Sequence, residues 1–453
     1  MSGTRDSFPV ADDLVDCIMR ALPDLSSLSS VILVSKHIYE VFKCHPSSIV
    51  SAVAYNHIGP ALPQALRAAR HDKDRDTRDP SNWVPESEVL NTPITRSEAQ
   101  TLNQDARVVS ELEDLFSWSH KDPTSPKSVL SENESMRFCR AMYRFLLYAD
   151  TFRCDEEEDE DEDEDGDLVL LNYTEEKERF FDSLGDDTQF LEFAVIYRFL
   201  CETVQWTARA IGEFYPEWTG DNPEVDMLGF VVSTGPEVVL QMFKCQSGAP
   251  FIPVPENEEN LEEFCFIARD LAKAFERRRL GKPDWNLHEM KKVILDDYYK
   301  YEDHPCDNCK QASQRLWSSA NWPLLKGILS PGELGAAMKG HLPRNFTERQ
   351  PLTQYLERPA FCYPDLFKWM IEHNTELDGG QPLTPDNWLC EGCLRLLVRS
   401  KMHEWWLERK RAEGIAVPAE NCWYGYNCRT QAHRPQHASK LNHLCEPIRG
   451  DPA

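Results

Sequence analysis

Long apolar runs are missing from this sequence of 453 residues. No stretch of 18 apolar residues occurs, so we expect no membrane-spanning helix. The first ten residues contain no apolar segment, and we therefore expect no secretory signal peptide. The cysteine count, 15, is odd, which argues against a disulfide framework. These features predict an intracellular protein, nuclear or cytoplasmic, in which cysteine pairs bind metal or perform redox chemistry.

Positive charge is also scarce. The chain has 49 Lys and Arg against 76 Asp and Glu, a net charge of −27. Such a surface repels phosphate backbones and anionic lipids, which argues against general nucleic-acid or membrane binding. One segment differs, because Arg395 to Gly450 holds ten Lys or Arg and five Asp or Glu. An anionic polymer could bind there, although Arg399 to Arg411 could equally form only the solvated face of a helix.

The common catalytic motifs are absent. The sequence has no phosphate-binding glycine loop, no Gly-x-Ser-x-Gly turn and no His-Glu-x-x-His pair, and His288-Glu289 lacks the second histidine. We therefore predict a protein without an active site. An unrecognised thiol–imidazole site remains an alternative, since 15 cysteines and 13 histidines are present.

The length of the chain predicts two to four domains, and apolar spacing predicts a mostly α-helical fold. A capping-box pattern at Thr95-Arg96-Ser97-Glu98 predicts a helix start. Further helices are expected over 49–69, 136–152, 190–214, 261–280 and 287–301, whereas 227–255 is rich in Gly and Pro and is expected to be less regular. We assign residues 51–300 to a central helical domain, interrupted by a disordered acidic loop over 155–167.

The N-terminal segment carries closely spaced apolar residues. Leu14, Ile18 and Leu22 recur on one helical face, and Leu25 and Leu28 begin a second short helix. With Phe8-Pro9 and Val34-Ser35-Lys36, this pattern resembles the F-box. The resemblance implies a three-helix module over residues 5–50 that docks onto the Skp-type adaptor of a cullin ubiquitin ligase. The implied contact residues are Pro9, Leu14, Ile18, Leu22, Leu25 and Leu28. Alternatively, these helices simply begin the central domain.

Two Cys-x-x-Cys pairs lie in the region 301–412, at Cys306 and Cys309 and at Cys390 and Cys393. Each pair has a spacing that chelates one metal ion, so we predict one shared four-cysteine zinc site. A redox pair, or two unrelated pairs, remain alternatives because eighty residues separate the halves. A RING finger is not expected, since it needs eight ligands at closer spacing.

The segment 418–447 combines Cys422, Cys428, His437 and His443. Two thiolates and two imidazoles suit tetrahedral Zn²⁺, and Gly425 allows the tight turn between the cysteines. The pattern resembles the poly(ADP-ribose)-binding zinc finger, or PBZ. This resemblance implies that Tyr424 and Arg429 contact ADP-ribose. The alternative is a zinc knuckle that only fixes the C-terminus.

Taken together, these patterns predict a substrate-receptor adaptor of a Skp–cullin–F-box ubiquitin ligase that recognises an unknown protein through its helical and zinc-bound regions. A poly(ADP-ribose)-binding nuclear protein, whose N-terminal helices are structural, is the main alternative.

Overall fold

The computed structural model describes residues 11–71, 79–122, 124–152, 174–211, 227–245, 267–281, 290–297, 305–313, 315–358, 361–374 and 382–449. The fold is mostly α-helical, as the sequence predicts. Within these ranges, extended pairing is limited to isolated bridges such as Trp317 with Leu389. No helix in the described ranges is long and apolar enough to cross a membrane. The predicted acidic loop 155–167 and Pro9 lie outside the described residues.

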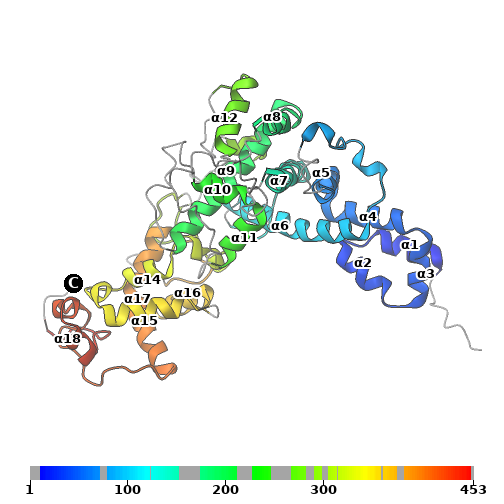
Figure 1. Ribbon diagram of the computed structural model, residues 1–453. Coiled ribbons are helices and arrows are strands. Elements are labelled where there is room, and N and C mark those ends of the chain that lie inside the picture. The colour runs from blue at the N-terminus through cyan, green and yellow to red at the C-terminus, as the bar shows by residue number, and fades with distance from the viewer. Residues whose placement is uncertain are drawn as a thin grey trace, which may run out of the picture.

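Four short helices form a bundle at the N-terminal end of the molecule (Figure 1). They are α1 (Asp12–Arg20), α2 (Leu25–Ile32), α3 (Lys36–Cys44) and α4 (Pro46–Ile58). Asp24 and Ser35 cap α2 and α3 by accepting a backbone N–H in the first turn. The Asn56 side chain of α4 donates to the carbonyls of Arg20 and Leu22, at 2.7 and 2.9 Å, and fixes the turn between α1 and α2.

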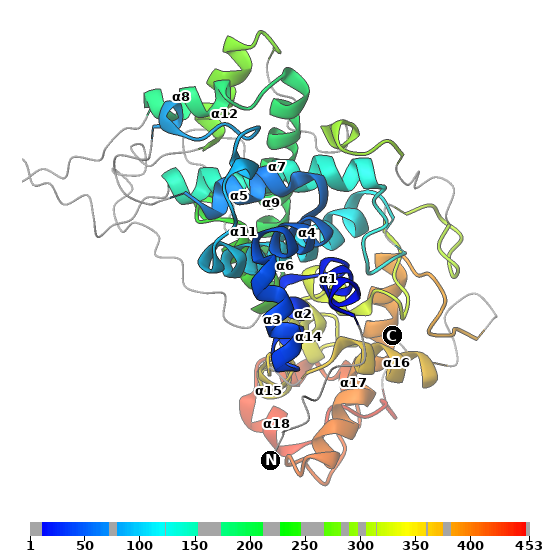
Figure 2. The same ribbon diagram turned by 90° about the vertical axis from the view of Figure 1, so that its right-hand side faces the viewer.

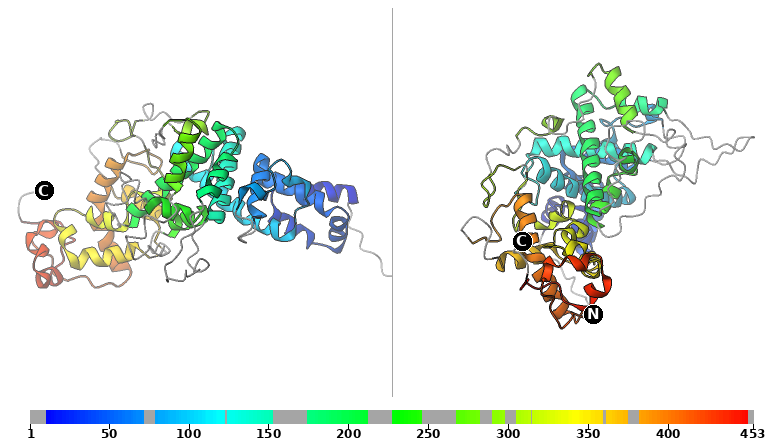
Figure 3. Two further views of the ribbon diagram at one scale, coloured as in Figure 1. Left: turned by 45° about the horizontal axis from the view of Figure 1, so that its top comes forward. Right: turned by 90° about the vertical axis from the view of Figure 1, so that its left-hand side faces the viewer.

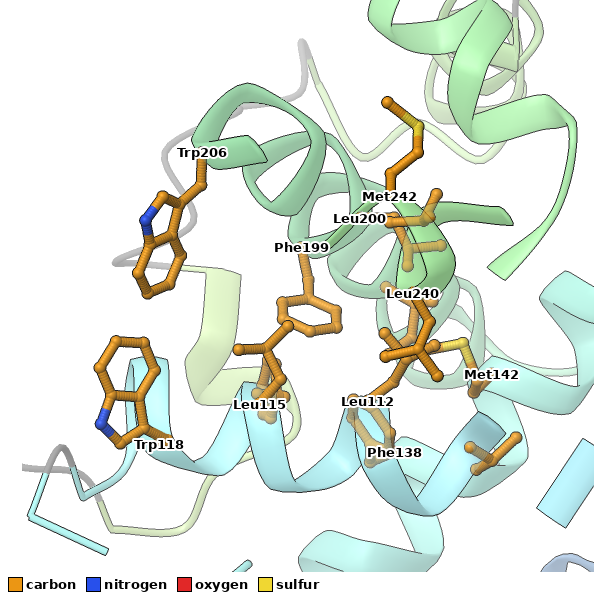
Figure 4. Close-up of a cluster of buried hydrophobic side chains, with 14 of the residues drawn as sticks. Leu112, Leu115, Trp118, Phe138, Met142, Phe199, Leu200, Trp206, Leu240 and Met242 are labelled. Atoms are coloured by element: carbon orange, nitrogen blue, oxygen red, sulfur yellow. The ribbon is translucent and has the colours of Figure 1, made fainter. Parts of the chain in front are cut away.

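Helices of 7 to 25 residues build the middle of the chain. They are α5 (Leu62–Ala69), α6 (Arg96–His120), α7 (Glu132–Phe152), α8 (Thr174–Asp182), α9 (Asp187–Ile211), α10 (Met227–Ser233), α11 (Pro236–Cys245) and α12 (Ile267–Arg277). The predicted capping box is present, because Thr95 and Glu98 each accept the other's backbone N–H. Figure 4 shows apolar side chains of α6, α7, α9 and α11 packed together, with Trp118 and Trp206 stacked at a centroid distance of 5.0 Å.

Two predictions for the middle of the chain are wrong. The segment predicted to be irregular from 227 contains α10 and α11, separated by Gly235, whose φ of 111° ends the first helix before Pro236 starts the second. The helix predicted over 287–301 does not continue through the described residues 290–297, which form a 3₁₀ turn, Lys291–Val293. Tertiary bonds explain its end: Arg137 donates to the Ile294 carbonyl, and Glu134 accepts the Asp296 N–H at 2.9 Å.

The C-terminal region lies at the end of the molecule opposite the N-terminal bundle (Figure 3). It contains η9 (Trp322–Gly327), α14 (Pro331–Ala336), η10 (Leu342–Arg344), α15 (Phe346–Leu356), α16 (Tyr363–Glu372) and α17 (Glu391–Ala412). The last segment adds η11 (Gly425–Asn427), η12 (Arg429–Ala432) and α18 (Pro435–Lys440). Helix α17 is the internal support of this region, since Leu394, Leu397 and Trp406 on it are fully buried.

Candidate metal centres

The two Cys-x-x-Cys pairs meet, although eighty residues of sequence separate them. The ligand atoms of Cys306, Cys309, Cys390 and Cys393 all lie within 4.8 Å of one another. The Sγ–Sγ distance is 3.7 Å between Cys306 and Cys393 and 3.7 Å between Cys309 and Cys390. Four thiolates placed about 2.3 Å from Zn²⁺ would be separated by about 3.8 Å. The cluster therefore has the dimensions of a tetrahedral four-cysteine site.

The two halves have different local structures. Cys306 and Cys309 lie in a tight loop closed by the Pro305–Ala312 bridge, and Lys310 adopts a left-handed φ of 59°. Cys390 is the residue directly before α17, and Cys393 lies in the first turn of that helix. The positive end of the α17 dipole lies beside these two sulfurs. Burial is nevertheless the largest effect on both thiols and raises the pKa of Cys390 and of Cys393 above its usual value.

Polar contacts around the four-cysteine cluster act against burial, and at Cys306 they outweigh it. The Asn308 amide donates to Cys393 Sγ at 3.3 Å, and the Cys390 N–H donates to Cys306 Sγ at 3.2 Å. Burial raises the pKa of the Cys306 thiol, but backbone N–H donors, with Cys309 the largest of them, outweigh burial and lower the pKa below its usual value. The Cys-x-x-Cys pattern does not predict this role of Asn308 as a donor to a cysteine sulfur. Its position between Cys306 and Cys309 is the one hint in the sequence.

The second cluster consists of Cys422, Cys428, His437 and His443, whose ligand atoms also lie within 4.8 Å of one another. His437 Nε2 is 3.4 Å from Cys428 Sγ and 3.9 Å from Cys422 Sγ. Sulfur and nitrogen ligands of one tetrahedral Zn²⁺ would be about 3.5 Å apart. Cys422 precedes η11, Cys428 follows it, and α18 carries His437.

His443 shows most directly that this cluster fits a metal. Its ring is fully buried, and neither Nδ1 nor Nε2 has a hydrogen-bond partner. A buried imidazole without partners is costly, whereas coordination would satisfy one nitrogen. Burial, with a smaller effect of neighbouring His437, lowers the pKa of His443 to about 4. The ring is therefore neutral near pH 7, which is the form that binds metals.

The segment that carries the second cluster is also held against the body of the C-terminal region. Tyr426 is buried, and its carbonyl accepts the His341 N–H at 2.8 Å and the Gln431 side chain at 3.0 Å. Gln431 in turn accepts from Asn345 at 2.9 Å. The ring of Tyr426 packs edge-on against His403 of α17, at a centroid distance of 5.2 Å. Residues 418–447 are thus docked rather than suspended on a linker.

The two residues assigned to ligand contact are both accessible. Tyr424 is 47% exposed and Arg429 is exposed. Neighbouring Trp423 is 55% exposed, and the Arg449 guanidinium lies over its ring at 4.0 Å. The ligand pattern in the sequence predicts no role for Trp423 or Arg449. The available signal was the position of Trp423, directly after Cys422.

The predicted docking residues divide into two groups. Leu14 and Ile18 of α1 are 58% and 54% exposed. Leu25 and Leu28 are buried in the bundle, and Leu22 packs partly against the core. Both buried leucines belong to α2, which packs against α3, α4 and α6. Leu33 and Val34, after α2, add 82% and 68% exposed apolar side chains that were not predicted as contacts.

Comparison of the chain with protein-family models, curated proteins and solved structures finds no match. The two Cys and His clusters, which could each hold a metal ion, are therefore identified by their geometry alone.

Proposed function

We propose that this protein is a non-enzymatic adaptor that docks onto the Skp-type subunit of a cullin ubiquitin ligase through α1 and recognises a protein substrate through its C-terminal region. Within this proposal each metal cluster holds one Zn²⁺, as a structural ion that uses all four ligand positions. Zinc would supply stability to the small segment 418–447, which has few apolar residues of its own to bury.

One observation carries the docking proposal: the apolar surface of α1 extends beyond the part that the bundle covers. Val15 and Met19 are buried, whereas Leu14 and Ile18, on the adjoining side of the helix, are more than half exposed. A helix that only starts a domain needs no more apolar surface than the domain buries. Exposed apolar side chains next to a buried face are typical of a helix that packs against a partner.

Substitution of the exposed face tests this proposal. The double variant L14D/I18D places charges on the outer face of α1 and should abolish co-purification with the Skp-type adaptor while leaving the far-ultraviolet circular dichroism unchanged. The matched control is T92D/Y55D, which adds two charges at exposed positions outside α1. Equal adaptor recovery with L14D/I18D and with the control would contradict docking through α1.

A second function is supported by the exposed side chains of the zinc finger. Tyr424 presents an aromatic face, and Arg429 presents a guanidinium, beside a centre that keeps its four ligands. An adenine ring stacks on such a face, and a pyrophosphate pairs with such a cation. We propose that this segment binds ADP-ribose units of poly(ADP-ribose), so that the adaptor would select modified targets. Thr430 and Leu441 replace an arginine and an aromatic residue of the PBZ pattern, so the contact rests on Tyr424 and Arg429.

A further inference from the structure

The zinc finger and the segment before α15 form one continuous surface. The 3₁₀ helix η10 packs against η12 of the finger, and α15 packs against α18. The buried Asn345–Gln431 hydrogen bond, 2.9 Å, joins the two segments at their centre. Figure 2 shows α15 and α18 next to each other, as the contacts require. Asn345 and Gln431, which are 86 positions apart in the sequence, therefore lie next to each other.

Both segments contribute exposed cations to this junction. Arg344 and Arg349 flank the start of α15, and Arg429 and Arg434 flank η12. All four are exposed, and none forms an ion pair with a carboxylate in the described part of the chain. The only acidic residue of α15, Glu348, faces inward and accepts from Lys410 Nζ at 2.9 Å. Its charge therefore does not offset the outer arginines.

Segments 339–349 and 418–449 together contain seven Lys or Arg and three Asp or Glu, in a chain whose net charge is −27. The junction is thus an island of positive charge. This local charge favours an anionic ligand, which the negative charge of the rest of the chain would repel elsewhere.

Exposed aromatic rings accompany these cations. Phe346, the first residue of α15, is 71% exposed, and Tyr424 is 47% exposed. Aromatic faces between cations are the usual platform for a flexible chain that carries bases and phosphates, because each base stacks while each phosphate pairs with a guanidinium. A phosphopeptide would use the arginines but would have no bases to stack on Phe346.

We infer that Arg344, Phe346 and Arg349 extend the ligand site of the zinc finger across the junction, so that the site binds several successive units of poly(ADP-ribose) rather than one. We call the set Arg344, Phe346, Arg349, Tyr424, Arg429 and Arg434 the junction strip. This inference rests on the proposed ADP-ribose binding by Tyr424 and Arg429. The inference adds a preference for longer polymers. Only a ligand of several ADP-ribose units can contact the finger and reach Arg344, Phe346 and Arg349 as well.

Chain-length dependence tests the junction strip. The full-length protein is titrated with mono-ADP-ribose and with poly(ADP-ribose) chains of about 15 units. The variant R344A/R349A should weaken polymer binding about tenfold and reduce the slope of log affinity against log salt by between one and two, since two phosphate contacts are lost. Its affinity for mono-ADP-ribose should not change. Y424A should weaken binding of both ligands, with zinc content unchanged.

The matched control is K36A/R96A, which removes two exposed positive charges near the N-terminal bundle. Polymer affinity that is the same in R344A/R349A and in this control, while Y424A still weakens binding, would overturn the strip and leave the finger's function intact. No effect of Y424A on either ligand would instead overturn ADP-ribose binding by the finger. If oligo(dA) of equal charge binds as tightly and depends equally on Arg344 and Arg349, poly(ADP-ribose) is the wrong occupant.

Discussion

At the scale of single residues, Gly425 decides whether the second metal cluster can form. Its φ is +41°, and a Cβ built on it would lie 2.1 Å from the backbone oxygen of Cys445. The Gly425 N–H donates to the Cys422 carbonyl at 2.9 Å, so the same turn positions the first ligand. Only glycine combines this left-handed conformation with such a close approach of two backbone segments.

Gly425→Ala should therefore disrupt the turn between Cys422 and Cys428 and prevent the second cluster from binding zinc. We expect zinc content to fall from two ions per chain to one and the free energy of unfolding to drop by more than the ~1 kcal/mol that a left-handed alanine costs by itself. Gly414→Ala is the matched control, because Gly414 has a φ of 68° but nothing within 4 Å of its Cβ position. Metal analysis and chemical denaturation of both variants check this. Identical losses in the two variants would mean that the Cys445 contact is unimportant.

At the scale of secondary-structure elements, α17 joins a metal ligand pair to the core. Its first turn carries Cys390 and Cys393, and its later turns bury Trp405 and Trp406. The knuckle at Cys306 has almost no secondary structure and is held to α17 by the Trp317–Leu389 bridge and by the cluster itself. A metal ion at this position would therefore stabilise a loop that has no hydrophobic core of its own.

Substitution of one ligand in each cluster should remove one metal at a time. We expect two Zn²⁺ per wild-type chain, one in Cys390→Ser and one in Cys422→Ser, because the clusters share no ligand. Cys445→Ser should keep both, since the Cys445 thiol donates to the carbonyls of Cys422 and Asn442 and lies outside the ligand set. Inductively coupled plasma mass spectrometry measures the ratio. A wild-type chain without metal would contradict both centres.

Element-scale features differ in how well the sequence predicts them. The Thr95 capping box and the ligand spacings are local patterns with one physical cause each, and the structure confirms that both sets of four ligands come together. Apolar periodicity identified the helices of the N-terminal bundle but not which side each leucine faces, so Leu14 and Leu25 received the same role and differ in burial. The finger packs against the body of the C-terminal region through the hydrogen bond between Asn345 and Gln431. These two residues are far apart in the sequence, so no local sequence pattern predicts their contact.

At the scale of the whole molecule, the proposed partner surface and the region with the two candidate metal clusters lie at opposite ends, with the long helices between them (Figure 1). This separation would allow the C-terminal end to hold a target while α1 is bound. The arrangement also requires the finger to keep a fixed orientation on the body. The Tyr426 carbonyl, the Asn345–Gln431 pair and Gly340 provide that contact, since a Cβ on Gly340 would lie 2.6 Å from the Tyr426 oxygen.

Loss of the second metal ion should therefore also destabilise the segment 339–349, which packs against the finger. In C422S/C428S, η11 and η12 lose the ligands that shape them, and the Tyr426 carbonyl no longer accepts the His341 N–H. We expect faster hydrogen exchange over 339–349, with unchanged exchange in α1 to α4, measured by mass spectrometry on the full chain. Cys445→Ser is the control, because serine can still donate to the carbonyls that Cys445 contacts. Exchange over 339–349 that matches the control would mean that the finger folds independently of the body, and the junction strip would then lose the rigid support on which its two halves depend.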